Sequence, residues 1–357
     1  MDKLKVGIVG CNGITLYSHI PAWVRLKDEV EIVAVSDRIE ERMNIENIEG
    51  ISKNIKKYKD YHDMIADKDI DIIDIATPNY LHSIISVEAL EAGKNVLTEK
   101  PDAISVSEMQ RMIAAEKKSG KLLMACRNCR HYPVAEFFKK YIDDGKLGEI
   151  YSGSCGYIRR RGIPGKGGWF TTKALSGGGP VFDLGVHMLD LAIYYMGNPK
   201  AVSITGCTFN KFSETDLSDS VNSAFGDKVP GGIFDVEDSA MGFIRFENGS
   251  CLQLEFSWAS NIEQEKDWVE LRGTKGGIYF TSKDLAKNAI FTEENGTLVN
   301  IYPKCPHYGG HPAVMKNFVD VLMGRDKPDY TTEQGLQMIK ILEGFYKSAE
   351  LGREIEI

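Results

Sequence analysis

The first 125 residues alternate short apolar segments with segments of helical periodicity, and this alternation limits the fold more strongly than any other feature. Apolar runs predict strands at residues 5–10, 30–37, 71–77, 95–100 and 121–126. Helical segments lie between them, at residues 14–26, from 40 onward, 82–93 and 105–120. Strands that alternate with helices form a parallel, doubly wound sheet with right-handed crossovers. The sequence therefore predicts an α/β fold for this part of the chain.

The pattern changes after about residue 130. Residues 238–258 alternate apolar and polar side chains around Asn248-Gly249, which is typical of a β-hairpin, and residues 267–280 predict two further strands. An antiparallel or mixed sheet with one solvent-facing side fits this alternation. Two amphipathic helices are expected near the end, at 313–323 and 332–351. We therefore expect two domains, at residues 1–127 and 128–357.

The composition of the chain limits the classes of binding partner and indicates the cell compartment. The 357-residue chain carries a net charge of −8, which argues against nucleic acid or an anionic membrane as the main partner. No apolar stretch approaches the ~20 residues of a membrane span. The chain begins directly with a predicted strand, without a signal-peptide pattern, and its seven cysteines are an odd number. These features predict reduced thiols and a cytoplasmic protein.

The segment GIVGCNGIT after the first predicted strand resembles a dinucleotide-binding turn. Such a turn uses glycines so that the backbone can approach a pyrophosphate at a helix N-terminus. Gly10 fits the first glycine position, Asn12 occupies the second, Gly13 follows, and Thr15 replaces the third glycine. Asparagine tolerates left-handed backbone better than most residues, so the turn is still expected. A purely structural strand-to-helix turn is the alternative.

The second predicted strand ends in VAVSD, which places Asp37 at the carboxyl edge of the sheet. An acidic residue there accepts hydrogen bonds from ribose hydroxyls and repels a 2′-phosphate, which favours NAD. Arg38 beside it would stack on adenine or tolerate a phosphate, so NADP stays an alternative. Asp37 would also serve as the N-cap of the next helix.

Two further strand ends meet the same edge of the sheet. They are ATPNYLH, residues 76–82, and TEKP, residues 98–101. Ligands of open parallel sheets bind outside the carboxyl ends of the strands. Lys100 is therefore expected where the nicotinamide of a bound dinucleotide would lie.

At this point the chain resembles the glucose-fructose oxidoreductase / inositol dehydrogenase / MocA family. The matching pieces are GIVGCNGI, VSD, ATPNYLH, EKP, RNCRHYP, GGGPVFDLGVHMLD and the tail GRDKP…GREIEI, in family order across essentially the whole chain. Asn12 departs from the pattern, which usually has glycine. The resemblance implies an N-terminal Rossmann domain, a C-terminal α/β domain with an open, mostly antiparallel sheet, and NAD(P)-dependent oxidation of sugar or cyclitol hydroxyls. It also implies a constrained Lys100–Pro101 bond, often cis.

The resemblance also implies a catalytic set of Lys100, Asp183 and His187. Asp183 and His187 lie four residues apart in an apolar helical segment that follows three glycines, so they would share one helix face. A histidine, with an ordinary pKa near ~6.5, suits proton transfer at neutral pH. Lys100 would stabilise the developing alkoxide, and Asp183 would hold a neighbouring hydroxyl. The sequence leaves open whether lysine or histidine is the formal base, and a helix cap with a core histidine is the non-catalytic alternative.

The remaining predicted site residues fall into two groups. The residues expected to contact the cofactor are Gly10, Asn12, Gly13, Ile14, Asp37, Arg38, Thr77, Pro78, Asn79, His82, Glu99, Lys100 and Trp169. The residues expected to contact substrate are Asn128, Arg130, Arg161, Trp169 and His307.

No metal is expected. Cys126 and Cys129 form a CxxC pair without a second pair to complete a zinc site. His307 and His311 have the spacing of a metal pair but no third ligand nearby in sequence. The alternatives for these two histidines are substrate contact and a flexible, glycine-rich surface loop.

These observations favour an NAD-dependent dehydrogenase that oxidises a secondary ring hydroxyl of a sugar, glycoside or cyclitol, such as an inositol or C3 of a pyranoside. A non-catalytic relative that senses nucleotide or sugar is the alternative from another class. An enzyme that oxidises only transiently, during lysis or epimerisation, also stays open. The expected partner is a small polyol or sugar, and the family habit implies a homodimer or homotetramer.

Overall fold

The computed structural model describes residues 3–306 and 308–357, which form two compact units. The first unit contains residues 1–128 and 311–336, and the second contains residues 129–310 and 337–357. The segment 311–336 therefore belongs to the first unit, although the expected boundary after residue 127 would assign it to the second. In the described part of the chain, no helix is long and apolar enough to cross a membrane.

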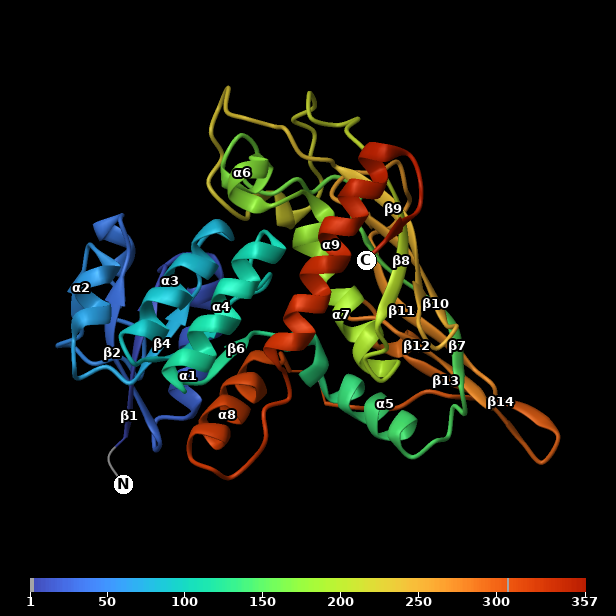
Figure 1. The fold of residues 1–357 in the computed structure, drawn as a ribbon, viewed down its shortest axis with the longest axis horizontal. Helices are drawn as coiled ribbons and strands as arrows, with labels where there is room; N and C mark the ends of the chain where they lie inside the picture. Colours follow the sequence, from blue (N-terminus) through green and yellow to red (C-terminus); the bar gives the residue numbers. More distant parts are fainter. Residues whose placement is uncertain (1–2, 307) are drawn as a thin grey trace. The chain divides into compact units, whose positions relative to one another are not determined.

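The first unit is built on a six-stranded parallel sheet in the order β3-β2-β1-β4-β5-β6 (Figure 1). The doubly wound sheet expected from the sequence is thereby confirmed. The strands are β1 (Leu4–Val9), β2 (Val30–Ser36), β3 (Lys56–Tyr58), β4 (Ile72–Ile75), β5 (Asn95–Thr98) and β6 (Leu123–Ala125). The helices are α1 (Ile20–Arg25), α2 (Tyr61–Ala66), α3 (Tyr80–Glu91), α4 (Val106–Ser119) and α8 (His311–Leu322).

The helix expected from Glu40 onward is wrong in extent, because only one 3-10 turn forms at Glu40–Met43. Buried apolar side chains follow at Ile45, Ile51 and Ile55, in a stretch of turns and irregular chain. Gly50 in this segment has a φ of +90°, with Val24 packed against it. The segment therefore covers the core as an irregular chain.

Local signals fix the ends of α4. The Ser105 hydroxyl accepts a hydrogen bond from the N–H of Glu108, and the Glu108 carboxylate accepts one from the N–H of Ile104. This exchange closely resembles a capping box, which satisfies N–H groups that have no partner inside the helix. Gly120 ends the helix in a left-handed conformation. Residues on α8, among them Phe318, join the core packed on β1 and β2.

The described residues of the second unit form a nine-stranded sheet in the order β14-β13-β12-β11-β7-β10-β9-β8-β15. Only the pair β7 and β10 is parallel, and the other pairs are antiparallel, as expected. The strands are β7 (Ile150–Ile158), β8 (Ala201–Phe209), β9 (Ser239–Phe246), β10 (Cys251–Ser257), β11 (Lys266–Gly273), β12 (Gly276–Phe280), β13 (Ala289–Glu294), β14 (Thr297–Ile301) and β15 (Ile355–Glu356).

Helices cover one face of this sheet (Figure 1). Phe345 of α9 (Thr332–Leu351) packs against Gly206 on β8 and Gly242 on β9. Because these glycines have no side chains, α9 can approach the two strands closely. The other face leaves Cys207, Phe209 and similar side chains exposed. The helices of this unit are α5 (Pro133–Asp143), α6 (Lys173–Ser176), α7 (Val186–Tyr195) and the greater part of α9 (Thr332–Leu351).

Asn-Gly pairs form two of the tight hairpins of the second unit. Asn295 and Gly296 both have positive φ, at 52° and 76°, and join β13 to β14. This is the backbone geometry of a type I′ turn, which matches the twist of antiparallel strands. Gly249 has a φ of +84° between β9 and β10. The hairpin expected at Asn248-Gly249 is confirmed.

Candidate active site

The turn after β1 has the geometry of a dinucleotide-binding loop. Gly10 has a φ of +92°, and a Cβ there would lie 2.4 Å from the carbonyl oxygen of Ala76, so only glycine fits. The Thr15 hydroxyl donates to the Gly10 carbonyl over 2.6 Å, and the Asn12 side-chain oxygen accepts from the N–H of Gly13 over 2.8 Å. The two residues that replace glycines thus brace the turn with their own side chains.

Asp37 is fixed at the carboxyl end of β2 by two backbone hydrogen bonds. Its carboxylate accepts the N–H of Cys11 and the N–H of Ile39, each over 2.9 Å. A carboxylate has about four lone-pair positions, so it can still accept hydrogen bonds from two hydroxyls. The expected N-cap role is wrong, because Ile39 is the N-cap residue of the 3-10 turn Glu40–Met43. The Asp37 carboxylate accepts the N–H of Ile39 in a local turn, and the link to Cys11 ties it to the glycine turn.

A buried polar atom at the end of β4 shows that the residues present fit a bound dinucleotide. The Thr77 hydroxyl is inaccessible to solvent and has no hydrogen-bond partner among the described residues. Buried hydroxyls without partners are rare and indicate a group that a ligand would satisfy. Thr77 lies beside Pro78 and the buried Asn79, at the sheet edge where parallel sheets bind their ligands.

Lys100 follows β5 and is joined to Pro101 by a cis peptide bond, which confirms that expectation. The Glu99 carboxylate accepts the N–H of Lys100 over 3.0 Å and lies 2.9 Å from Nε2 of His19. Nδ1 of His19 lies 2.9 Å from the Asp74 carboxylate, to which the Trp23 indole N–H also donates over 2.7 Å.

Charge compensation governs this buried group. Burial by itself would lower the pKa of His19, but its hydrogen bonds and charge interactions with Asp74 and Glu99 outweigh burial and raise that pKa to about 10. Burial would likewise raise the pKa of Glu99, yet His19 and His311 hold it well below its ordinary value. Without a bound metal, this pKa makes His19 an imidazolium between two carboxylates at neutral pH.

Other buried contacts hold the far side of the Lys100 segment. The two ring nitrogens of His82 lie 2.7 and 2.9 Å from the carbonyl oxygens of Pro101 and Thr77. His82 is only 1% exposed, so it braces the backbone of two strand ends. Asp102, one residue past Pro101, pairs with Arg127 and accepts the Tyr330 hydroxyl.

Asp183 and His187 lie in the second unit, in a π-turn (Val181–Gly185) and in α7, which continues from it. The sequence predicted an ordinary helix here, and the wider turn is a difference from that expectation. Such turns are frequent at functional sites. The Trp258 indole N–H donates to the Asp183 carboxylate over 2.9 Å, and Nδ1 of His187 lies 3.7 Å from the Cys129 sulfur.

Two of the three glycines before this turn make room for Glu237 and Tyr346. A Cβ on Gly179 would lie 2.1 Å from the Glu237 carbonyl oxygen, and one on Gly178 would lie 2.1 Å from the Tyr346 hydroxyl. The Glu237 carboxylate accepts the N–H groups of Gly179 and Val181 over 3.0 and 3.3 Å, and the Tyr346 hydroxyl over 2.7 Å. Burial raises the pKa of Glu237 to about 6, against these hydrogen bonds.

The predicted substrate residues have varied surroundings. Arg130 forms a buried two-pronged ion pair with Asp190, with both N···O distances 2.7 Å. The Arg161 guanidinium donates to the Ser260 carbonyl over 2.8 Å. Trp169 stacks on Phe170 with ring centroids 3.7 Å apart.

The remaining predicted residues can be placed briefly. Asn128 is buried in the first unit, and Arg38 directly follows Asp37. His307 lies outside the described residues. His311 was expected in a flexible loop, which is wrong, because it is the first residue of α8 and its Nε2 lies 3.5 Å from Glu99.

Sequence reasoning did not single out His19, Asp74, Glu237, Tyr346 or Trp258. His19 is a partner of the predicted residue Glu99, and Trp258 is a partner of the predicted residue Asp183. Asp74 pairs with His19, and Glu237 and Tyr346 brace the glycine segment before Asp183. All of these contacts join positions that are tens of residues apart along the chain. His19 is flanked by Ile20 and Pro21, so its local sequence is that of a core-facing helix. No local pattern marks these residues, because their roles depend on which strand ends the topology brings together.

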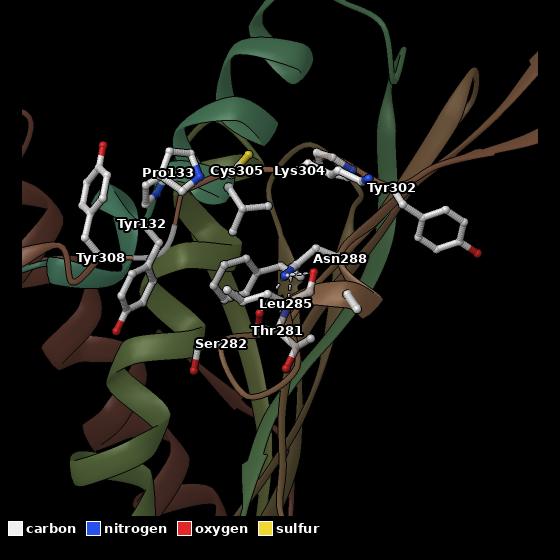
Figure 2. Close-up of a pocket in the computed structure, with 15 residues that line it drawn as sticks. Tyr132, Pro133, Thr281, Ser282, Leu285, Asn288, Tyr302, Lys304, Cys305 and Tyr308 are labelled. Atoms are coloured by element: carbon white, nitrogen blue, oxygen red, sulfur yellow. Dashed lines mark hydrogen bonds between the residues drawn. The ribbon is translucent and has the colours of Figure 1, made fainter.

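The second unit also contains a cavity of about 450 Å³, shown in Figure 2. Aromatic side chains of Tyr132, Phe280, Tyr302 and Tyr308 line it, and Asn288 closes one side by hydrogen bonds to Thr281. The lining contains none of the predicted catalytic or cofactor residues. This cavity is therefore not the predicted active site.

The parallel sheet, the glycine turn braced by Asp37, and the unsatisfied Thr77 hydroxyl together define a dinucleotide-binding oxidoreductase. Comparison with known families agrees. An oxidoreductase family with an NAD-binding Rossmann fold, GFO_IDH_MocA, matches residues 4–126, and the GFO/IDH/MocA C-terminal domain matches residues 136–279. The chain belongs to the GFO/IDH/MocA family, and its first unit contains an NAD-binding Rossmann domain.

Individual relatives extend this result. D-glucoside 3-dehydrogenase of Escherichia coli K12 is 31% identical over 100% of this chain and 98% of its own length. Levoglucosan dehydrogenase of Pseudarthrobacter phenanthrenivorans is 32% identical over 62% of this chain and 58% of its own length. A solved levoglucosan dehydrogenase in complex with NADH and levoglucosan covers 100% of both chains with a TM-score of 0.86 at 22% identity, which shows the same fold.

Proposed function

We propose that the protein oxidises a secondary ring hydroxyl of a glycoside or a related sugar or cyclitol with NAD⁺. The observation that carries the proposal is the complete set of Lys100, Asp183 and His187, each on a segment braced by buried side chains. The chain is also similar over its full length to a D-glucoside 3-dehydrogenase. A pyranoside is therefore the leading substrate class, and inositols come next.

The proposed chemistry divides proton and hydride between different groups. The bound nicotinamide supplies the hydride acceptor. His187 takes the hydroxyl proton, and the Lys100 ammonium donates a hydrogen bond to the same oxygen, which stabilises charge that develops in the transition state. Asp183, held by the Trp258 indole, accepts a hydrogen bond from a neighbouring hydroxyl and orients the ring. In this scheme His187 is the formal base; the alternative is that Lys100, as a neutral amine, takes the proton.

The cofactor residues are proposed as predicted, with two roles made more specific. Asp37 accepts the ribose hydroxyls of NAD and disfavours the 2′-phosphate of NADP, by about 1–3 kcal/mol. The Thr77 hydroxyl, which has no hydrogen-bond partner among the described residues, donates a hydrogen bond to the dinucleotide. His82 and Glu99 act indirectly, because the first braces the Pro101 carbonyl and the second the N–H of Lys100.

The substrate contacts, the oligomeric state and the cellular location are also proposed from the resemblance to the family. Trp169 and Arg161 are proposed to contact the sugar or its aglycone, with Asn128, Arg130 and His307 as further contacts. The exposed face of the nine-stranded sheet, with Phe209 and Met241, is the proposed surface of a homodimer or homotetramer. The cytoplasm is the proposed location.

A substrate screen tests the proposal directly. The purified protein is mixed with methyl glycosides, free sugars and inositols, with NAD⁺ or NADP⁺, and formation of reduced nicotinamide is followed by absorbance. The proposal predicts turnover of at least one glycoside or cyclitol and higher kcat/KM with NAD⁺. Tight NADH binding without turnover of any compound would instead support a sensing relative. Equal use of NADP⁺ would refute Asp37 as the selector.

A further inference from the structure

Four metal-binding side chains from four separate elements meet inside the first unit. They are His19 at the end of the turn before α1, Glu99 after β5, Cys126 after β6, and His311 at the start of α8. One potential ligand atom from each lies within 4.8 Å of the other three. The side chains of His19, Glu99 and His311 are 0%, 9% and 12% exposed, and Cys126 is also buried.

We propose that this cluster is a structural Zn²⁺ site. Two imidazole nitrogens, one carboxylate oxygen and one thiolate form a donor set that suits tetrahedral zinc, which binds such atoms at about 2.0–2.3 Å. Those bond lengths place neighbouring ligand atoms about 3.3–3.8 Å apart. Nε2 of His311 already lies 3.5 Å from Oε1 of Glu99, and Nε2 of His19 lies 2.9 Å from it. All four ligand atoms lie within 4.8 Å of one another, so side-chain shifts of about 1 Å would bring them to the spacing of a tetrahedral site.

The surroundings of His19 match those of a zinc ligand. A metal-binding histidine characteristically presents one ring nitrogen to the ion and donates the other N–H to a carboxylate. Nε2 of His19 faces the cluster, and Nδ1 lies 2.9 Å from the Asp74 carboxylate. The Trp23 indole N–H in turn donates to Asp74 over 2.7 Å. This second layer fixes the tautomer and the orientation of the ring.

A proton on His19 is the competing source of positive charge, and it explains part of the cluster. An imidazolium satisfies Asp74 and Glu99 without help. The ring of His311 and the thiol of Cys126 then remain as two further hydrogen-bonding partners of the same Glu99 carboxylate. Zinc explains all four side chains. Because four protein atoms fill the tetrahedron, the ion would be structural, and it would hold Glu99 beneath the N–H of Lys100.

The test measures metal binding by the full-length protein and does not depend on its activity. The protein is stripped with a strong chelator and then titrated with Co²⁺, a spectroscopic substitute for zinc. The proposal predicts one Co²⁺ per chain, with intense tetrahedral ligand-field bands and a thiolate-to-cobalt charge-transfer band. Zn²⁺ should displace Co²⁺ and raise the thermal midpoint of the stripped protein.

Variants assign the ligands. Cys126→Ser should lose the charge-transfer band, and His311→Gln should weaken Co²⁺ binding by at least about tenfold, as should Asp74→Asn through His19. His62→Gln is the matched control, because His62 lies in the same unit beside Asp60 and Glu88 but is exposed, and this variant should bind as the wild type does.

The proposal fails if the wild type binds no Co²⁺ at micromolar concentration, or if its spectrum lacks the charge-transfer band. It also fails if His311→Gln binds as tightly as the wild type. Any of these results would leave the protonated histidines, without a metal, to balance Glu99. If Cys126→Ser does not fold, the wild-type spectrum and His311→Gln still decide.

Discussion

Glu99 and Glu237 are both buried carboxylates that brace a segment carrying predicted catalytic residues, yet their pKa values move in opposite directions. Glu99 faces His19 and His311, and its pKa falls well below the ordinary value despite burial. Glu237 accepts uncharged donors, the Tyr346 hydroxyl and three backbone N–H groups including its own, and burial raises its pKa to about 6. A buried carboxylate thus stays ionised when a cation faces it, and uncharged hydrogen bonds compensate only in part.

The comparison also separates two ways of holding a catalytic side chain. Lys100 follows a carboxylate fixed by an ion-pair network that reaches Asp74. The segment before Asp183 lies on a carboxylate whose contacts depend on close backbone approach at Gly178 and Gly179. Removing His19, the charge partner of Glu99, should therefore lower the free energy of unfolding strongly. Changing the charge state of Glu237 should have a smaller effect on it.

The largest expected effect comes from His19→Leu, which leaves Asp74 and Glu99 without their cation. Breaking a buried ion pair in this way typically costs about 3–5 kcal/mol. The free energy of unfolding, measured with urea at pH 7 in the presence of a chelator, should fall by that amount. His62→Leu, at an exposed histidine that also contacts carboxylates, should change it by less than about 0.5 kcal/mol. A loss below about 1 kcal/mol for His19→Leu would break the comparison.

A smaller effect, of opposite sign, is expected for Glu237→Gln. The pKa of Glu237 is raised from 4.5 to about 6 in the folded state, so its favourable contribution is full below pH 4.5 and is lost as the pH rises through about 6. The difference corresponds to about 2 kcal/mol. The stability of Glu237→Gln minus that of the wild type should therefore increase by about 2 kcal/mol as the pH rises from about 4.5 to 7.5.

Urea unfolding of both proteins across this pH range checks the sign. Titrations of all other groups cancel in the difference between the two curves. If the curves stay parallel, Glu237 has an ordinary pKa and the contrast with Glu99 is wrong.

The smallest effect is expected for Tyr346→Phe, which removes one uncharged donor from Glu237. A hydrogen bond to a charged group is worth about 1.5–3 kcal/mol and one between uncharged groups about 0.5–1.5 kcal/mol, so the pH-dependent part of the loss is about 1 kcal/mol. The loss of stability should therefore be larger at pH 7.5 than at pH 5. In the Glu237→Gln background the same substitution should cost less at pH 7.5, which a double-mutant cycle would show. Equal losses in both backgrounds would remove Tyr346 from the account.

Much of this architecture follows from local sequence patterns. Alternation of apolar runs with helical periodicity predicts the parallel sheet, because each pattern determines its own element and short connections leave few topologies. The Asn295-Gly296 hairpin is equally local, since both residues adopt the positive φ that a type I′ turn requires. The segment after Glu40 escapes prediction, because its form depends on covering a core assembled elsewhere.

The site is predictable only in part for the same reason. Gly10, Asp37 and Lys100 occur at strand ends, and the sheet topology alone places them on one edge. Glu237 and Tyr346 brace the glycine segment from positions about 60 and 170 residues away, so no spacing rule finds them. The π-turn at Asp183 could not be predicted either, because an apolar stretch indicates a helix but does not distinguish an α-helical turn from a wider π-helical one.

The most direct test of the account is the turnover number of His187→Ala on the best substrate from the screen, with the NAD⁺ dissociation constant measured alongside. The account predicts that kcat falls by about 10²–10⁴-fold while NAD⁺ binding is unchanged. His187 accepts the proton only as the reaction proceeds, so its loss affects the transition state and not cofactor binding. Lys100→Ala should behave similarly, and the double variant should lose much less than the product of the two. His131→Ala, a control at a histidine paired with Glu136, should retain activity. A near wild-type kcat for His187→Ala would contradict the account and leave the glycine-preceded helix a packing element.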